Sequence, residues 1–594
     1  MKRVITILLA MLLPVALLAG CGQKIQTETV APSEKLKSCS LCIKAVEGLP
    51  EDFIFGMDAS QVPALERSGV KYYDFDGREQ DVFKTLAQCG VNYIRVRVWN
   101  DPFDAEGRGY GGGNCTLDTA LEIGKRATKY GMKLLVDFHY SDFWADPGKQ
   151  KAPKAWQDLD LEAKAAALEQ YTRESLQKLK EAGVAVGMVQ LGNETNGAMC
   201  GESQWENAVT LMKAGSKAVR EVCPEAKAAV HFTNPENKGS LVYWARTLAD
   251  AGLDYDVFGT SYYPYWHGSL ENLTQSLNEV AETFGKQVMV METSYAYTGE
   301  DTDFHGNTIS ASGDAKALPY TPLGQATSVR NVIEAVAKAK NGIGVCYWEG
   351  TWISVGTSSK AENEKLWEEY GSGWATRFSG EYDADGGKWY GGSAVDNQAM
   401  FDAQGRPLES LTVFALVKTG NQGDGVELPV PTEETAAPPV SDGDNLLQNP
   451  GFEDGVDGPW TADNLGGAKE LNIEQKPGDS RTGEWHWHFW SPDAGTVEFT
   501  LEQTPEGLES GTYDYSIWIM GGDCGEAEVY AYAKLDGETV ATAPMEITSW
   551  NEWHPGQISG LEYTAGQTLT LGIYVRTDAA GAWGKIDDAA LTRR

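Results

Sequence analysis

Eight short apolar runs, each followed by a longer amphipathic segment, constrain the fold of this chain more than any other feature. The runs occupy residues 53–60, 91–99, 132–140, 184–194, 226–234, 255–263, 287–295 and 343–350. The segments between them, such as 80–90, 160–183 and 205–223, carry apolar residues at three- and four-residue spacing, which is typical of helices that pack one face on a sheet. This alternation predicts an α/β fold, a (β/α)8 TIM barrel whose active site lies at the C-terminal ends of the strands.

A doubly wound open sheet is the alternative architecture. It is disfavoured because the glycine-rich stretch "GRGYGGGN" (107–114) follows polar residues rather than a strand, so it reads as a loop and not as a phosphate-binding turn.

The rest of the chain predicts further domains, since 594 residues exceed what one core accommodates. Residues 421–443 are rich in Pro, Glu and Thr and predict an extended linker. Beyond the linker, alternating runs at 497–504, 513–522, 526–535 and 568–577 predict a β-sandwich of the jelly-roll kind. We therefore expect a barrel over 48–420 and a binding module over 444–594.

The N-terminus predicts export. Lys2 and Arg3 precede an apolar run from Val4 to Leu18, too short for a membrane span and typical of a signal peptide. The following "LAGC" resembles the bacterial lipoprotein box, which implies cleavage after residue 20 and lipidation of Cys21. An uncleaved anchor is the alternative. We expect an exported protein on a bacterial cell surface, tethered to the membrane through residues 21–47.

Charge and cysteine content narrow the partners. With 85 acidic and 49 basic residues the net charge is −36, which disfavours nucleic acid and anionic membrane surfaces and leaves neutral substrates. Eight cysteines follow Cys21. "CSLC" (39–42) alone is weak evidence for a disulfide or a metal, and Cys89 and Cys346 read as buried hydrophobes.

Two glutamates close predicted strands three apart. The fourth run ends on Asn193 and Glu194 in "MVQLGNETNG", and the seventh contains Glu292 in "VMVMETSY". A carboxylate at the end of a buried strand is either a satisfied structural group or a catalytic one. In a barrel these ends face each other, which places two carboxylates on either side of a glycosidic bond.

The sequence resembles glycoside hydrolase family 53, the endo-β-1,4-galactanases, from about Gly48 to Gly420. The resemblance is carried by "GMDASQVPALE", "YIRVRVWNDP", "GYGGGN", "LLVDFHYSDFWADPGKQ", "QLGNETNG", "SYYPYWHG" and "METSY". It implies a retaining enzyme that cleaves β-1,4 linkages in galactan or type I arabinogalactan of pectin. It also implies that Glu194 is the acid/base and Glu292 the nucleophile.

Each role sets a requirement on the surroundings. Glu292 must be ionised, and Arg95 or Arg97, of which Arg97 is nearer the catalytic end, is expected to keep it so. Glu194 must carry a proton, so apolar walls and the Glu292 charge are expected to raise its pKa. We expect Asn193 to bind the sugar 2-hydroxyl. The other expected substrate contacts are Arg97, His139, Asp142, Trp144, Tyr262, Tyr263, Trp266 and Trp348, with only one of the two tyrosines in the pocket.

A structural calcium site is expected after the seventh run, with a solvated acidic loop as the alternative, and no organic cofactor is expected. In "EDTDFHGN", Asp301, Asp303, His305 and Asn307 supply oxygen donors at alternate positions, as in the calcium loop of bacterial family members, with His305 contributing its backbone oxygen.

The C-terminal segments "NLLQNPGFEDG" and "WGKIDDAALT" resemble galactan-binding modules of family 61. In such modules a structural calcium would implicate Glu453 with Asp587 or Asp588, and Trp487, Trp550 and Trp553 are candidates for the sugar-binding face.

The leading hypothesis is a monomeric galactanase lipoprotein that acts on a neutral polysaccharide and touches the membrane only through its lipid. A retaining β-glycanase specific for mannan, xylan or cellulose, and a surface lipoprotein that binds glycans without cutting them, are the alternatives.

Overall fold

The computed structural model describes residues 25–309, 318–356, 359–388, 390–421 and 445–593, apart from 457, 477–478, 493–494, 506, 526 and 549–552. The chain divides into two compact units, Met1–Pro431 and Thr432–Arg594. The division falls inside the predicted linker.

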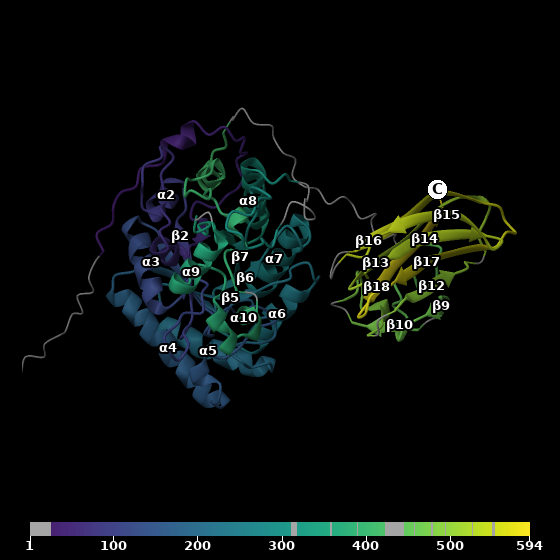
Figure 1. The fold of residues 1–594 in the computed structure, drawn as a ribbon, viewed down its shortest axis with the longest axis horizontal. Coiled ribbons are helices and arrows are strands. Elements are labelled where there is room, and N and C mark those ends of the chain that lie inside the picture. The colour runs from purple at the N-terminus through teal and green to yellow at the C-terminus, as the bar shows by residue number, and fades with distance from the viewer. Residues whose placement is uncertain are drawn as a thin grey trace, which may run out of the picture. The chain divides into compact units, whose positions relative to one another are not determined.

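The first unit is a closed barrel of eight parallel strands (Figure 1). Each strand pairs with the next in sequence, and β1 pairs with β8 to close the barrel. The predicted TIM barrel is therefore confirmed. The strands are β1 (Ile54–Asp58), β2 (Tyr93–Val98), β3 (Lys133–Phe138), β4 (Val186–Leu191), β5 (Lys227–Phe232), β6 (Val257–Ser261), β7 (Gln287–Thr293) and β8 (Gly342–Tyr347).

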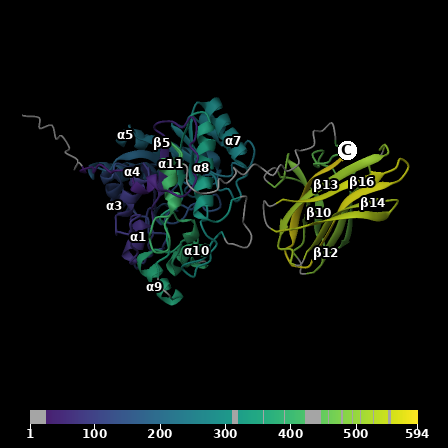
Figure 2. The ribbon, with the colours of Figure 1, turned by 90° about the horizontal axis from the view of Figure 1, so that it is seen from above.

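Helices surround these strands, as Figures 1 and 2 show from two directions. Their sequences explain their bounds: in α4, for example, Asp160 accepts a hydrogen bond from the Ala163 amide and caps the N-terminus, and Leu168, Leu176 and Leu179 form its buried face. The helices are α1 (Val62–Arg67), α2 (Val82–Gln88), α3 (Leu117–Lys129), α4 (Leu161–Glu181), α5 (Trp205–Val222), α6 (Ser240–Asp250), α7 (Leu270–Phe284), α8 (Pro322–Lys338), α9 (Lys360–Tyr370), α10 (Ala384–Lys388) and α11 (Val413–Leu416). Short 3₁₀ helices lie at Glu34–Lys37, Lys154–Trp156, Arg377–Glu381, Asp396–Gln398 and Glu409–Thr412.

The side chains inside the barrel change from apolar to polar or charged along the barrel axis. One layer is apolar and includes Leu135, Met188, Met289 and the predicted buried thiol of Cys346. One step toward the C-terminal ends of the strands, the inward side chains become polar or charged although they remain buried: Asp58, Arg95, Asp137, Gln190, His231 and Glu292. Because buried charges are costly unless they are paired, this second layer marks the functional end of the barrel.

The described part of the predicted N-terminal tether, residues 25–47, packs against the barrel, and we call it the strap. Ile43 and Val46 are buried in the barrel core. The Glu28 amide donates to the carbonyl of Lys129 at the end of α3, and the Ser33 amide donates to that of Gln88 at the end of α2. Both helices end next to the N-terminal ends of β3 and β2, so the strap lies at the face of the barrel opposite the functional end.

The second unit is a sandwich of two five-stranded sheets, which confirms the predicted β-sandwich. One sheet has the order β10-β11-β18-β13-β16 and the other β15-β14-β17-β12-β9. Along β12, buried and partly exposed side chains alternate, as expected for a strand with one face on a core. The strands are β9 (Thr461–Gly466), β10 (Glu470–Gln475), β11 (Trp485–Trp490), β12 (Val497–Gln503), β13 (Gly511–Gly522), β14 (Glu528–Leu535), β15 (Glu538–Met545), β16 (His554–Tyr563), β17 (Leu569–Thr577) and β18 (Trp583–Arg593).

Among the residues described in the two units, no helix is both long and apolar enough to cross a membrane.

Candidate active site

Glu194 lies just beyond β4 in a strained turn. Gly192 has φ of 88° and Glu194 itself has φ of 45°, a left-handed conformation that side chains other than glycine rarely adopt. The turn is held because the Thr195 amide donates to the His231 carbonyl at 2.9 Å. Strain that is maintained by surrounding hydrogen bonds is typical of functional positions.

Neutral groups hold the Glu194 carboxyl group. Ser261 Oγ, at the end of β6, donates to Glu194 Oε1 at 2.5 Å. Burial raises the pKa of Glu194 to about 8, and the nearby negative charge of Glu292 acts in the same direction. Glu194 therefore carries a proton at neutral pH, as a general acid requires.

Glu292 lies within β7 and is held by a cation. Arg95 Nη1 lies 2.8 Å from Glu292 Oε1, and the Tyr263 hydroxyl donates to Glu292 Oε2 at 2.9 Å. Burial raises the pKa of Glu292, whereas Arg95 and Tyr263 lower it. Because a cation contacts Glu292 whereas a neutral hydroxyl contacts Glu194, Glu292 is the carboxyl group that ionises first.

Of the two arginines that the sequence leaves open, Arg95 and not Arg97 is the one that contacts Glu292. Arg95 also pairs with Asp58 at 3.1 Å and Asp137 at 2.8 Å. Arg97 lies two residues further toward the mouth, where Glu349, beyond β8, captures its guanidinium. Its side chain is 1% exposed and lies over the Trp144 ring at 4.3 Å, so it supports the aromatic wall. A direct contact between Arg97 and substrate stays a prediction.

An aromatic wall lines the mouth beside these carboxyl groups. Trp144 and Trp374 stack with their ring centroids 4.5 Å apart, and the centroid of Trp348 lies 6.4 Å from that of Trp144. Trp348, Trp144 and Trp374 are each partly exposed, as surfaces for stacking on sugar rings must be. Trp374 was missed by the sequence analysis because it lies far beyond β8 in an irregular segment, and no local pattern indicates that it returns to the mouth.

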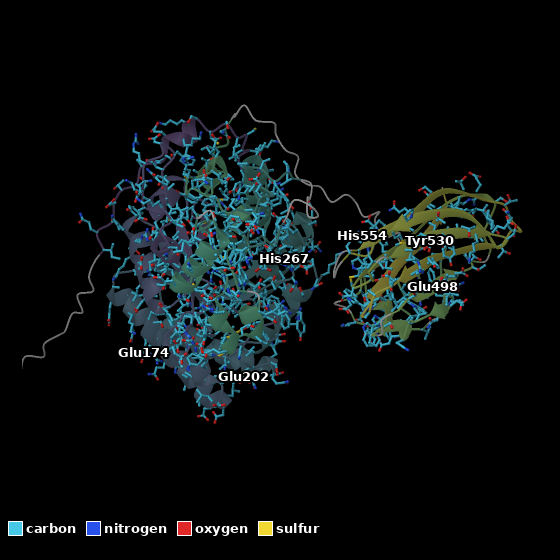
Figure 3. All side chains as sticks on the ribbon, viewed as in Figure 1. Glu174, Glu202, His267, Glu498, Tyr530 and His554 are labelled. Carbon is cyan, nitrogen blue, oxygen red and sulfur yellow. The ribbon has the colours of Figure 1, made fainter. Side chains whose placement is uncertain are left out.

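The structure distinguishes the two adjacent tyrosines after β6. Tyr263 reaches Glu292, and the Trp266 ring, which is 47% exposed, packs near it with centroids 5.3 Å apart. Tyr262 is buried, and its hydroxyl donates to the carbonyl of Gly268, so it shapes the loop and does not face substrate. His267 (labelled in Figure 3) fixes the same loop by accepting from the Tyr263 amide at 3.1 Å.

Two further candidates are held by protein partners. His139 is 2% exposed, and both its ring nitrogens have protein partners: Trp99 and the Ala145 amide at Nδ1, and Asp137 at Nε2. Asp142 is fully buried and accepts from the backbone amides of Asp101 and Lys154. These partners give both side chains a role in holding the strand ends, and their contacts with a sugar stay predictions.

The Asn193 side chain is held rigidly. Its Oδ1 accepts from Arg95 at 2.9 Å, and its Nδ2 donates to the carbonyl of Ala145 at 2.8 Å. This bond uses one of the two N–H groups on Nδ2, so the other can donate to a ligand. A hydrogen bond from it to the 2-hydroxyl of a sugar stays a prediction.

The loop after β7 brings oxygen ligands together. Carboxylate oxygens of Asp301, Asp303 and Asp396 lie within 4.8 Å of one another, and Asn307 Oδ1 and Asp396 Oδ1 are buried without a hydrogen-bond partner. Burial raises the pKa of Asp303 to about 8, and the nearby negative charge of Asp396 acts in the same direction. Asp396 comes from a distant segment and carried no sequence signal. This donor set fits a hard cation such as Ca²⁺.

In the second unit, the residues predicted for binding sites differ in their exposure and in their protein partners. Trp487 is 2% exposed and belongs to the sandwich core, so it is not part of a sugar-binding face; Trp550 lies outside the described residues, and Trp553 is partly exposed. Asp587 accepts from two backbone amides, those of Arg481 and Thr482, and Asp588 pairs with Arg481 at 2.6 Å. A cation at Asp588 would have to displace the Arg481 guanidinium.

The cysteines in the described residues, Cys39 and Cys42 among them, are all free. The two cysteines of "CSLC" therefore do not close a disulfide in this structure.

Comparison with known proteins agrees with this site. The model of glycosyl hydrolase family 53 matches residues 54–414. The chain is 56% identical over 390 residues to endo-β-1,4-galactanase of Bacillus subtilis (strain 168), covering 65% of this chain and 91% of that one. It is 35% identical over 317 residues to arabinogalactan endo-β-1,4-galactanase of Cellvibrio japonicus, covering 51% of this chain and 81% of that one.

Two solved structures are similar to parts of this chain. The family 53 catalytic domain of Ignisphaera aggregans is 36% identical, with a TM-score of 0.56, and covers 64% of this chain and 99% of that one. TmCBM61, solved in complex with β-1,4-galactotriose, is 28% identical, with a TM-score of 0.23, and covers 25% of this chain and 99% of that one. Since the family model matches more than half of the chain and a barrel with two glutamates at its mouth underlies the match, this chain belongs to glycosyl hydrolase family 53.

Proposed function

We propose that this chain is a retaining endo-β-1,4-galactanase that acts on galactan and type I arabinogalactan. The observation that carries the proposal is the pair of glutamates at the ends of β4 and β7, one beside neutral donors and the other beside Arg95. The galactanases among its relatives supply the substrate. No organic cofactor is needed for this chemistry.

The geometry assigns the steps. Ionised Glu292 attacks the anomeric carbon, while protonated Glu194 gives its proton to the leaving oxygen as the glycosidic bond breaks. Glu194, now ionised, takes a proton from water, whose oxygen attacks the anomeric carbon and releases Glu292. The net result is hydrolysis with retained configuration.

Substrate and linkage are tested by release of reducing sugar from β-1,4-galactan, mannan, xylan, cellulose and β-1,3/1,6-linked arabinogalactan. Selective release from β-1,4-galactan is expected. Selective release from mannan, xylan or cellulose would favour a related β-glycanase, and silence on every polymer would favour a protein that only binds glycans.

The roles of the two glutamates are tested with azide and an aryl β-galactoside that has an activated leaving group. In Glu194→Ala the glycosyl-enzyme still forms, and azide attacks it from the face that water uses, so a β-glycosyl azide is expected. In Glu292→Ala, azide replaces the nucleophile and gives the α-glycosyl azide. The opposite anomers would reverse the two assignments.

We infer that the C-terminal module binds galactan and raises the local enzyme concentration on the polymer. Two outer faces are candidates. On one, the Arg481 guanidinium lies 3.7 Å from the Trp518 ring centroid. On the other, Tyr530 and Tyr574 stack at 4.9 Å, close to Glu498 (Tyr530 and Glu498 labelled in Figure 3).

Affinity electrophoresis of the full chain in galactan tests this inference. Glu292→Ala serves as the background so that the polymer is not degraded, and Trp518→Ala is compared with Tyr574→Ala. The variant that loses retardation identifies the face. Unchanged retardation in both would place binding outside these two faces.

We propose that Asp301, Asp303, Asn307, Asp396 and the backbone oxygen of His305 hold a Ca²⁺ ion. The support is the donor set and its two unpartnered oxygens. When bound, the ion would fix the loop after β7 by offsetting its buried negative charge. Thermal unfolding with Ca²⁺ or EDTA, in the wild type and in Asp303→Asn, tests the site: only the wild type should gain stability from the ion.

We further propose that Cys21 carries the lipid anchor. Glu28, whose amide contacts the barrel at Lys129, follows Cys21 by seven positions, and the chain between them spans at most about 25 Å. The anchor would thus hold the strap face toward the membrane and leave the mouth open to polymer. Fractionation of cells that express the wild type or Cys21→Ala tests this: the variant should leave the membrane fraction.

A further inference from the structure

Behind the proposed acid/base lies a buried dyad that its mechanism has not used. Ser261 and His231 are both fully buried. Ser261 Oγ lies 2.5 Å from Glu194 Oε1 and 2.9 Å from His231 Nε2. The three side chains come from the ends of β6, β5 and β4, so they form a chain of hydrogen bonds across neighbouring strands.

We propose that Ser261 and His231 are positioning residues that hold Oε1 of Glu194 and thereby direct its acidic proton to Oε2, toward the mouth of the barrel. The proposal rests on the function argued above.

The direction of the hydrogen bonds follows from the partners of His231. Three groups lie near its Nδ1: the Glu194 amide donates to it at 3.4 Å, and the amide nitrogen of Gln190 and Asn193 Oδ1 each lie 3.0 Å away. Asn193 Oδ1 already accepts from Arg95 and Gln190, whereas the backbone amide of Glu194 can only donate. We therefore assign the single proton of the neutral ring to Nε2, which donates to Ser261 Oγ. The hydroxyl proton of Ser261 is then available only to Glu194 Oε1.

The ring stays neutral because of its surroundings. Burial and the positive charge of Arg95 hold the pKa of His231 well below its ordinary value; His139 acts in the same direction, and Asp137 opposes them. A neutral ring donates to Ser261 without adding a charge beside Glu194. The dyad thus orients the acid without ionising it.

The same hydrogen bond matters in both halves of the reaction. The Ser261 hydroxyl lowers the pKa of Glu194, as does that of Thr233, whereas burial, Glu292 and Asp146 raise it. Once Glu194 has given up its proton, the Ser261 donor stabilises the carboxylate that must next act as a base. Ser261 therefore limits how far burial can raise the pKa of the acid/base.

The test is the pH dependence of kcat/KM on β-1,4-galactan in Ser261→Ala. Loss of the donor should move the basic limb to higher pH by about one unit and lower kcat about tenfold. Ser261→Thr, which keeps a hydroxyl, should restore the wild-type limb. If the basic limb of Ser261→Ala coincides with that of the wild type, the proposal is overturned.

Ser294→Ala is the matched control. Ser294 is also buried at a strand end. Its hydroxyl donates to Gln398 Oε1 at a distance of 2.5 Å, and not to a catalytic carboxyl group. Its basic limb should stay in place. A shift in both alanine variants would indicate loosening of the barrel end and would contradict the proposed dyad.

An activated aryl β-galactoside separates orientation of the acid from loss of packing. Because its leaving group needs no proton, the kcat/KM of Ser261→Ala should fall less on this substrate than on galactan. Equal losses on both substrates would overturn the proposal. If the wild type itself does not cut galactan, the proposed function fails, and this failure is distinguishable from the others.

Discussion

Glu194 and Glu292 are the same residue type at opposite sides of one barrel mouth, yet their surroundings prepare them for opposite tasks. Glu194 is held by the neutral hydroxyl of Ser261, and Glu292 by the cation of Arg95 and the hydroxyl of Tyr263. Burial raises the pKa of both carboxyl groups. Their partners decide which one keeps its proton at neutral pH, and hence which one is the acid.

The largest expected effect comes from removing the group that keeps its proton. Glu194→Gln should lower kcat/KM on galactan by about 10³-fold, because general acid catalysis is lost. In the wild type, kcat/KM should fall as pH rises through about 8, where Glu194 loses its proton. In Glu194→Gln this basic limb should disappear. A limb that persists would assign the titration to another group.

Replacing Arg95 should impair Glu292, the carboxyl group on the other side of the barrel mouth. Arg95→Lys keeps a positive charge but cannot reach Asp58, Asp137 and Glu292 together. We expect about a 100-fold loss of kcat. The acidic limb, where kcat/KM falls as Glu292 is protonated, should move to higher pH.

Thermal unfolding of Arg95→Lys is the control, since breaking a buried ion pair costs about 3–5 kcal/mol. The pH profile must be recorded below its unfolding temperature. An acidic limb at the wild-type pH would show that Arg95 stabilises the fold without tuning Glu292.

A smaller change sharpens the comparison without altering charge. Tyr263→Phe removes the hydroxyl that donates to Glu292 Oε2 but keeps the ring beside Trp266. About a tenfold loss of kcat is expected, with the acidic limb again shifted to higher pH. Tyr262→Phe, which removes the neighbouring hydroxyl that donates to the Gly268 carbonyl, is the matched control and should leave that limb in place.

The smallest effect is expected from the wall that serves both carboxyl groups equally. Trp374→Ala removes one partner of the Trp144 stack and should raise KM on galactan several-fold, with a smaller change in kcat. Neither pH limb should move, because no charge is altered. A shifted limb would mean that the wall also sets the electrostatics of the site.

Much of this arrangement could be predicted from local sequence. The eight apolar runs match the eight strands, although β8 begins one residue before its run, and the positions of Glu194 and Glu292 at strand ends follow from the runs themselves. Strand and helix periodicities are local properties, and so are signals such as the Asp160 cap of α4. The resemblance to family 53 then supplied the chemistry.

Other features depended on which side chains meet. Sequence could not choose between Arg95 and Arg97, because both share one face of β2 and only the position of Glu349 decides that Arg97 is captured elsewhere. It assigned sugar contacts to His139 and Asp142, since their location near a strand end is visible but their buried partners are not. Tyr263 was separated from Tyr262 only by the path of the chain after β6.

By itself, the sequence determined the barrel, the sandwich, the boundary region between them and the two glutamates, because periodicity and composition are local properties of the amino-acid sequence. The tertiary structure alone decided how the glutamates differ, since Ser261, His231, Arg95 and Tyr263 come from three other strand ends. Likewise, it decided that Asp396 joins the loop after β7 and that Trp374 joins the wall. Protonation and stacking depend on distances of a few ångströms between segments far apart in the chain, and only the folded barrel fixes those distances.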